Sequence, residues 1–350
     1  MQPKRLLAVY LIPYDCIGGV ECAARSLPSG TYGELQLQKA FLAYRPETTF
    51  LRAGDYSGIH RSENDPRNFI KILIWLHQKR PTLLVSSLWR CYFILILHKL
   101  FHPTCQTVCF LHSSKPVHFI DNFLAWFSML LSKKIWVDSY ATSIMRVPKC
   151  WQSKTIQISM KIKQQDPVTS LEPSPIFIFW GRLATHKRLN HALELFQAIH
   201  QQISRAQFWI VGPDGGELET LLKLQDKLRL QHSVKFFGPK LHSEIITLAA
   251  QCSFYLQTSE LEGLAMSVQE AMQLGLVPVV TPVGEIAHYC RDAINAIFVS
   301  SPDTTAARIA ELLNFPNQYR DMRKQAILTW SDVHLYRDQF LEYSFSLLQK

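Results

Sequence analysis

Short apolar segments alternate with longer helical patterns along almost the whole chain, and this alternation limits the fold more than any other feature. The apolar segments are residues 6–12, 83–86, 107–111, 135–137, 176–179, 208–211, 234–236, 254–256 and 277–280. Continuous apolar strands separated by helices are typical of parallel sheets with crossover helices. We therefore predict an α/β protein built from doubly wound parallel sheets.

A proline-rich stretch divides the two sets of strands. Residues 163–175 contain three prolines and few apolar side chains, which is typical of a connection between domains. A length of 350 residues accommodates two domains. We predict an N-terminal domain over residues 1–165, a linker over 163–175, a second domain over 175–330, and a last helix within 331–350.

Residues 259–280 place two carboxylates around the start of a helix. The pattern predicts a loop over residues 259–263 and a helix over 264–274, whose first turn has unpaired N–H groups at the positive end of the helix dipole. Such a helix start attracts an anion. Glu262 lies in the loop and Glu270 about two turns into the helix, so the segment suits the phosphate and hydroxyl groups of a nucleotide sugar.

The string E-G-L-A-M-S-V-Q-E-A-M-Q-L-G-L-V-P-V-V, residues 262–280, resembles the glutamate-seven-residues-glutamate signature of retaining glycosyltransferases of family 4, which have the GT-B fold. The register is unambiguous, because eight residues after Glu260 comes Val268, whereas eight after Glu262 comes Glu270. The resemblance implies two Rossmann-like domains facing across a cleft, with the final helix packed back on the first. Taken alone, the two carboxylates would also suit a solvated helix surface.

Two cations follow the strand at 176–179. The segment from Gly181 to Lys187 resembles the G-R-L-x-x-x-K segment of the family, at the sheet edge where α/β proteins bind ligands. The resemblance implies that Arg182 and Lys187 hold the donor diphosphate, for which a guanidinium and an ammonium are suited. A solvated basic loop is the alternative. Arg188 stands where the family usually has glycine.

Glycine loops and the helix start complete the implied donor site. Gly212 lies in a loop that resembles the glycine-rich loop of the family, although such a loop can be only a turn. Gly18 and Gly19 resemble its G-G-x-E loop, and a dinucleotide site is the alternative there, although G-x-G-x-x-G is absent. The implied donor-binding residues are Gly18, Gly19, Arg182, Lys187, Gly212, Gly263, Leu264, Ala265, Met266 and Glu270.

The resemblance also implies two catalytic residues. Glu262 is expected near the transferred sugar, and His112, at the end of the strand 107–111, matches the cleft histidine of the family. A structural histidine is the competing interpretation, and His118 is a second candidate. Asp15 is a weaker candidate for an acceptor contact. No residue is an evident nucleophile, so the mechanism of retention stays open.

We expect neither a metal nor a cofactor besides the donor substrate. No D-x-D occurs, so the metal-chelating pair of the other large glycosyltransferase fold is missing, and cations with a helix start would take its place. The eight cysteines form no C-x-x-C pair and are interpreted as reduced thiols. One family element is absent, because residues 155–162 stand where an I-P-N-G-V-D-like loop is expected.

The positive charge is concentrated in the N-terminal half. Residues 1–165 contain 21 Lys and Arg against 9 Asp and Glu, and residues 166–350 contain 16 against 19. Such a half suits an anionic membrane surface or a phosphorylated acceptor, whereas nucleic acid is not expected because no binding motif accompanies the charge. The apolar stretches 88–101 and 119–134 suit either a membrane surface or the core.

We therefore expect a metal-independent retaining hexosyltransferase that moves a hexose from a nucleoside-diphosphate sugar to a cell-surface or lipid-linked glycan, such as lipopolysaccharide or capsule. It is expected in the cytoplasm or peripherally on the inner face of the plasma membrane. A relative that isomerises or phosphorolyses sugars is disfavoured by residues 259–280. A non-catalytic paralogue that binds a sugar or a protein partner is the alternative from a different class.

Overall fold

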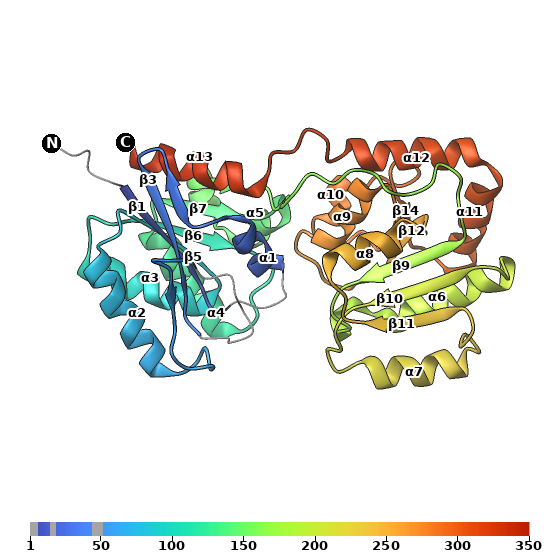
Figure 1. Cartoon of the computed structure of the whole chain (residues 1–350), viewed down its shortest axis with the longest axis horizontal. Helices are drawn as coiled ribbons and strands as arrows, with labels where there is room; N and C mark the ends of the chain where they lie inside the picture. Colours follow the sequence, from blue (N-terminus) through green and yellow to red (C-terminus); the bar gives the residue numbers. More distant parts are fainter. Residues whose placement is uncertain (1–5, 15–18, 44–51, 350) are drawn as a thin grey trace. The chain divides into compact units, whose positions relative to one another are not determined.

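The computed structural model describes residues 6–14, 19–43 and 52–349, and the chain forms two compact units (Figure 1). The N-terminal unit comprises residues 1–163 and 334–350, and the C-terminal unit comprises residues 164–333. The stretch 164–175 is held by the C-terminal unit, since Thr169 bonds to Gly275 O at 2.8 Å and accepts a bond from Arg323 Nε at 2.9 Å. The last segment of the chain, residues 334–350, belongs to the N-terminal unit.

The sheet of the N-terminal unit is parallel except at one edge. Its order is β2 (Gly30–Tyr32), β3 (Leu35–Phe41), β1 (Leu6–Ile12), β5 (Leu83–Ser87), β6 (Gln106–Leu111), β7 (Lys134–Val137) and β8 (Thr155–Gln157), with β4 (Tyr56–Ser57) on β3. Only β2 pairs antiparallel among the described strands. The sheet is therefore wound from the centre outward, as the strand and helix alternation predicts.

Helices cover both faces of this sheet (Figure 1). On one face, the side chains of β1, β5, β6 and β7 pack on α2 (Pro66–Lys79), α3 (Trp89–Phe101) and α4 (Phe119–Leu131). On the other face lie α1 (Gly19–Ser26) and the last helix, α13 (Tyr336–Leu348). Phe340 of α13 packs on Tyr10 and on Trp136, each with ring centroids 5.0 Å apart.

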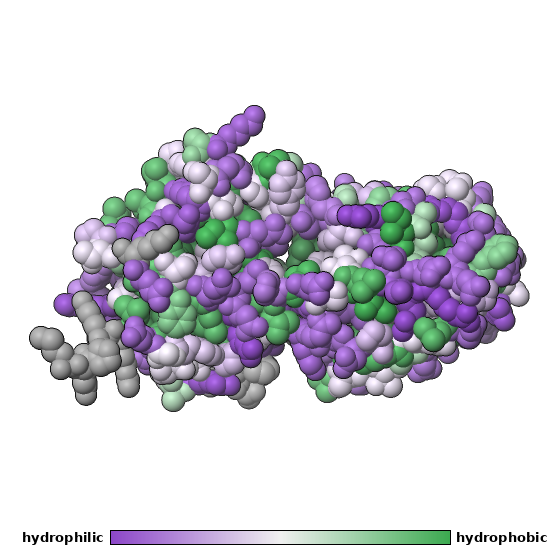
Figure 2. All heavy atoms as spheres, turned by 90° about the horizontal axis from the view of Figure 1, so that it is seen from above, coloured by the Kyte–Doolittle hydropathy of each residue, from purple (hydrophilic) through white to green (hydrophobic). Residues whose placement is uncertain are grey.

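The sheet of the C-terminal unit is parallel throughout its described strands. Its order is β11 (Val234–Gly238), β10 (Gln207–Val211), β9 (Ile176–Trp180), β12 (Phe254–Gln257), β13 (Val277–Val280) and β14 (Ile297–Phe298). The helices are α6 (Leu189–Gln202), α7 (Leu218–Lys227), α8 (His242–Ala249), α9 (Met266–Leu274), α10 (Ile286–Tyr289), α11 (Pro302–Asn314) and α12 (Pro316–Leu328). In the view of Figure 2, hydrophilic residues predominate on this unit, with hydrophobic residues scattered among them.

Every apolar segment singled out in the sequence forms a strand, whereas β2, β3, β4, β8 and β14 were not anticipated. Most of these strands have two or three residues, too few for a period-two pattern to stand out. The last helix begins at Tyr336 rather than near Ser331, because α12 ends at Leu328 and an irregular segment follows. Helix α9 begins at Met266 rather than Leu264, because Ala265 is left-handed with φ 58°.

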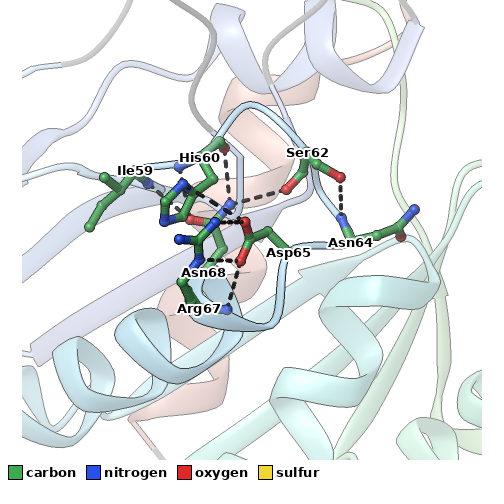
Figure 3. A network of polar contacts seen from close by, with 7 residues as sticks. All are labelled: Ile59, His60, Ser62, Asn64, Asp65, Arg67 and Asn68. Atoms are coloured by element: carbon green, nitrogen blue, oxygen red, sulfur yellow. Dashed lines mark hydrogen bonds and ion pairs between the residues drawn. The ribbon is translucent and has the colours of Figure 1, made fainter.

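A buried asparagine organises the segment that leads into α2 (Figure 3). Asn68 is fully buried, and its Oδ1 accepts bonds from the backbone N–H of Ile59 at 2.9 Å and of His60 at 3.2 Å. Its Nδ2 donates to the carbonyls of His60 at 3.0 Å and Ser62 at 3.1 Å. One side chain therefore satisfies four backbone groups that no strand or helix pairs.

Replacing Asn68 with alanine should destabilise the protein by about 2 to 3 kcal/mol, because several buried backbone groups lose their partners. Urea unfolding followed by circular dichroism measures this change. The exposed Asn122→Ala is the matched control and should change the unfolding free energy by less than about 0.5 kcal/mol. Equal effects of the two substitutions would contradict the structural role of Asn68.

Candidate functional site

The carboxyl edge of the C-terminal sheet brings together the loops that follow β9, β10, β12 and β13. Their backbones touch where glycine is required: a Cβ on Gly212, whose φ is 149°, would lie 1.8 Å from the carbonyl oxygen of Gly181. A Cβ on Gly284 would lie 2.1 Å from the carbonyl oxygen of Glu262. These contacts leave no room for a side chain, so the loops are held at this edge by their glycines.

An ion pair links the loop after β9 to the loop after β12. Lys187 Nζ lies 2.6 Å from Glu262 Oε1, and the two side chains are only 15% and 8% exposed. Gln257 Nε2 donates to the same oxygen at 3.0 Å, and the Tyr255 hydroxyl in turn donates to Gln257 Oε1 at 3.1 Å. Two predicted site residues therefore meet. Gln257 and Tyr255, which support them, were missed because they read as part of a buried strand.

The first turn of α9 is open. Its N-cap residue, Ala265, is left-handed and makes no side-chain hydrogen bond to the helix. The carbonyl of Leu264 accepts a bond from the Tyr289 hydroxyl at 2.9 Å, which fixes the turn that precedes the helix. The Val268 N–H donates to the Ala265 carbonyl at 2.9 Å, whereas the Met266 and Ser267 N–H groups have no carbonyl partner four residues earlier within the helix, so these two are available to an anion.

The first turn of α7, on the neighbouring part of the sheet edge, is already occupied by a carboxylate. Asp214 Oδ1 accepts bonds from the backbone N–H groups of Gly216, Glu217 and Leu218 at 2.8 to 3.1 Å. These bonds lower the pKa of the Asp214 carboxyl. The loop that contains Gly212 therefore caps its own helix, whereas α9 has no such side chain.

Glu270 lies in α9, where its side chain is partly buried beside Trp180. The Trp180 indole donates to Glu270 Oε2 at 3.2 Å. Burial raises the pKa of the Glu270 carboxyl, and the charge of His242 and the indole bond oppose that shift. His242 is held by Gln165, with the two side-chain nitrogens 3.0 Å apart. A partly desolvated carboxyl of this kind gains from hydroxyl donors. The sequence did not indicate His242, and it did not indicate Trp180 either, because a tryptophan at the end of a strand is typical of the hydrophobic core.

The remaining cation, Arg182, is exposed at the start of the loop after β9. Its neighbour His186 was not anticipated, although it lies inside the G-R-L-x-x-x-K segment. Partial burial lowers the pKa of His186, as do Lys187 and Arg182, while Glu262 acts in the opposite sense. Arg188 is left-handed with φ 48°, which explains why the family usually has glycine there.

In the N-terminal unit, His112 lies at the carboxyl end of β6. Its Nε2 is 2.8 Å from the Ser87 hydroxyl, which is itself 2.8 Å from the Tyr10 hydroxyl, and its ring packs on Phe110 with centroids 4.1 Å apart. Burial lowers the pKa of His112 to about 3, so its imidazole is neutral at physiological pH. Its Nδ1 is buried and has no partner among the described residues.

His118 has a structural role. Its Nδ1 accepts the backbone N–H of Asp121 at 3.1 Å and so caps α4, while its ring packs on Trp89. Gly19 begins α1, whereas Gly18 and Asp15 lie outside the described residues. Within residues 6–14, 19–43 and 52–349, no group of three His, Cys, Asp or Glu residues could hold a metal ion.

Solved structures with the same architecture define the class. HepE of Anabaena in complex with UDP superposes with a TM-score of 0.79 over 97% of this chain and 100% of that chain, at 14% identity. The lipopolysaccharide outer core galactosyltransferase WaaB gives a TM-score of 0.70 over 97% and 99%, also at 14% identity. At such identities the likeness establishes the fold, which is that of the GT-B glycosyltransferases.

Residues 161–329 match the family described as glycosyl transferases group 1. This match covers nearly all of the C-terminal unit and agrees with the resemblance of residues 262–280. A GDP-mannose:cellobiosyl-diphosphopolyprenol α-mannosyltransferase of Komagataeibacter xylinus is 26% identical over 183 residues, 51% of this chain and 46% of that protein. An N-acetyl-α-D-glucosaminyl L-malate synthase of Bacillus anthracis is 27% identical over 157 residues, 44% and 40% respectively. The chain therefore spans less than half the length of the curated relatives it matches.

Replacing Lys187 with methionine should cost about 3 kcal/mol of stability, because it leaves the buried Glu262 carboxylate without its cation. Glu262→Gln should cost less, about 1 kcal/mol, since the flexible Lys187 side chain can turn toward water. Urea unfolding of the two single variants and of the double variant measures the coupling. The double variant should be more stable than Lys187→Met, and strict additivity would contradict a coupled pair.

Because the pKa of His112 is lowered in the folded state, the unfolded chain binds a proton more readily below pH 6.5. This histidine therefore destabilises the folded protein as the pH falls from 6.5 toward 3, by at most about 1.4 kcal/mol per pH unit. His112→Asn should remove up to about 2 kcal/mol of the stability lost between pH 6.5 and pH 5. The exposed His232→Asn is the control in urea unfolding at both pH values; an unchanged pH dependence in His112→Asn would contradict the prediction.

Proposed function

We propose that the protein transfers a hexose from a nucleoside-diphosphate sugar to a cell-surface or lipid-linked glycan, with retention of configuration and without a metal. The observation that supports this proposal most directly is the uncapped start of α9, which lies between the Lys187–Glu262 pair and Glu270. The open helix start suits a phosphate, and the carboxylates on either side of it suit hydroxyl groups. A nucleotide sugar has phosphate in the middle and hydroxyl groups at both ends.

The donor diphosphate would bind the first N–H groups of α9, with Gly263, Leu264, Ala265 and Met266 lining the turn. Arg182 and Lys187 would then neutralise the charge that grows on the diphosphate as the glycosidic bond breaks. Lys187 is already within reach of the carboxylate of this turn. This arrangement uses cations and a helix dipole where other enzymes use a metal ion.

The two glutamates would receive different hydroxyl groups. Glu270, whose carboxyl is partly buried beside Trp180, is suited to the ribose hydroxyls of the nucleotide. Lys187 and Gln257 both contact Oε1 of Glu262, so Oε2 is suited to a hydroxyl of the transferred sugar. His112, as a neutral imidazole, would donate or accept a hydrogen bond rather than act as a general base, because its pKa of about 3 is far below neutrality.

The acceptor is proposed from the relatives. One matched enzyme is named for a polyprenol-linked saccharide, and one matched structure is a lipopolysaccharide galactosyltransferase. Both names fit an acceptor that is a glycolipid or a growing glycan. No helix in the described part of the chain is long and apolar enough to cross a membrane. We propose a cytoplasmic protein that meets its acceptor at the inner face of the plasma membrane.

Thermal unfolding with UDP, GDP, ADP or CMP, in the presence of EDTA, tests the donor site. One nucleotide at about a hundred times its dissociation constant should add about 2.7 kcal/mol of stability. Arg182→Ala should weaken this response, and Arg182→Ala with Lys187→Ala should abolish it. The exposed Arg205→Ala with Lys227→Ala is the matched control. An unchanged nucleotide affinity in the double variant at 182 and 187 would contradict the assignment.

Hydrolysis of the donor by the purified protein then separates an enzyme from a binding protein. Slow release of free sugar from the nucleotide sugar, absent in Glu262→Gln, would support catalysis. Nucleotide binding without any hydrolysis or transfer to a lipid-linked acceptor would instead identify a non-catalytic paralogue. No response to any of the four nucleotides would overturn the donor site itself.

A further inference from the structure

Helix α4 is predominantly apolar, yet the protein covers only one of its faces. Ala125 and Met129 are buried in the core cluster against β6 and β7. On the opposite side, side chains three or four positions apart are exposed, including Phe119 at 81%, Phe123 at 51% and Trp126 at 43%. A hydrophobic helix face is normally buried, so the outer face of α4 lacks a partner.

The exposed apolar area continues onto the next helix, α5 (Tyr140–Arg146). Asp121 of α4 pairs with Arg146 of α5 at 3.4 Å, so the two helices are neighbours, and Trp126 also packs on Trp151, which follows α5, with ring centroids 5.5 Å apart. We define the α4–α5 surface by the exposed residues Val117, Phe119, Ile120, Phe123, Trp126, Leu130, Tyr140, Ile144 and Met145. Nine of the 22 large hydrophobic residues that the described chain exposes thus fall within 29 consecutive positions. Such a concentration marks an interaction site.

The other apolar stretch of this unit behaves differently. Helix α3 buries Cys91, Ile94 and Leu95 in the core. Its exposed apolar residues are Phe93 near the start, and Leu100 and Phe101 at the end. The high apolar content of residues 88–101 is therefore explained by the core, whereas that of residues 119–134 is not.

The exposed charges of the segment that carries the α4–α5 surface have one sign. Residues 113–160, all of which the structure describes, contain two acidic residues, Asp121 and Asp138, and both are buried. Asp121 is paired with Arg146, and Asp138 accepts the hydroxyl of Thr142 at 2.7 Å. The lysines at 115, 133 and 149 are exposed and lie in the segments that precede α4, follow α4 and follow α5. The surface therefore combines an aromatic and aliphatic area with uncompensated positive charge.

We propose that the α4–α5 surface docks the protein on a bilayer that contains anionic lipids. Aromatic and aliphatic side chains enter the interface between headgroups and acyl chains, while exposed lysines are attracted by the anionic surface. A second copy of the chain is a poorer occupant, since a symmetric contact through one patch would bring like-charged lysines together. The benefit of docking, which is access to a lipid-linked acceptor, rests on the proposed function. Docking itself requires no sugar transfer.

Co-sedimentation with vesicles tests the proposal, without nucleotide. The protein should bind vesicles of phosphatidylcholine with 30% phosphatidylglycerol far better than vesicles of phosphatidylcholine alone, and 0.5 M salt should weaken binding. Lys133→Gln with Lys149→Gln should reduce the partition coefficient by about fivefold per charge removed. Phe123→Ser with Trp126→Ser should reduce it at least tenfold. Circular dichroism verifies that each variant is folded.

Matched controls lie on the C-terminal unit. Lys235→Gln with Lys324→Gln, and Leu222→Ser with Leu328→Ser, remove exposed residues of the same kinds and should leave binding unchanged. Equal binding to both vesicle types, no binding, or equal losses in the controls would overturn the proposal. So would a dimer in lipid-free sedimentation that Phe123→Ser with Trp126→Ser dissociates. Nucleotide-induced stabilisation, measured separately, shows whether the donor site fails as well.

Discussion

The ion pair between Lys187 and Glu262 is the interaction on which the candidate site depends. It connects the loops after β9 and β12, which are neighbours in the C-terminal sheet, and it is nearly excluded from water. A pair in this setting costs desolvation and persists because Gln257 supplies a further hydrogen bond to the carboxylate. The pair also places a cation and an anion at the mouth of an uncapped helix, where a phosphate can compete for the cation.

The two helix starts at this sheet edge explain why only one suits a ligand. At α7, the carboxylate of Asp214 accepts the backbone N–H groups of Gly216, Glu217 and Leu218, so a negative charge already lies at the helix start. At α9, Ala265 takes a left-handed conformation and offers no side-chain acceptor. A phosphate binds where the protein has left donors unpaired, and a glycine-rich loop alone does not ensure this. The difference between the two loops therefore lies in one side chain.

In the N-terminal unit, the two faces of the sheet differ in how fully the apolar side chains of their helices are covered. Phe340 of α13 supplies aromatic cover for Tyr10 and Trp136 on one face of the sheet. On the other face, α2 buries Ile72 and Leu76 and α3 buries Ile94 and Leu95, but nothing in the described chain covers the outer side of α4. The same hydrophobic effect that completes the core thus leaves an apolar area beside exposed lysines.

The sequence by itself determined the α/β class, the nine apolar strands and the spacing of Glu262 and Glu270 within one motif, because burial on both faces and helix periodicity leave a local pattern in the chain. It also indicated Arg182 and Lys187 through a contiguous motif. Only the tertiary structure decided that Lys187 meets Glu262, that Trp180 and Gln257 support the two carboxylates, and that α4 rather than α3 stays uncovered. Those facts depend on contacts between residues far apart in the chain, which no local pattern records. The short strands β2, β4, β8 and β14 were missed for the same reason, since their neighbours in the sheet define them.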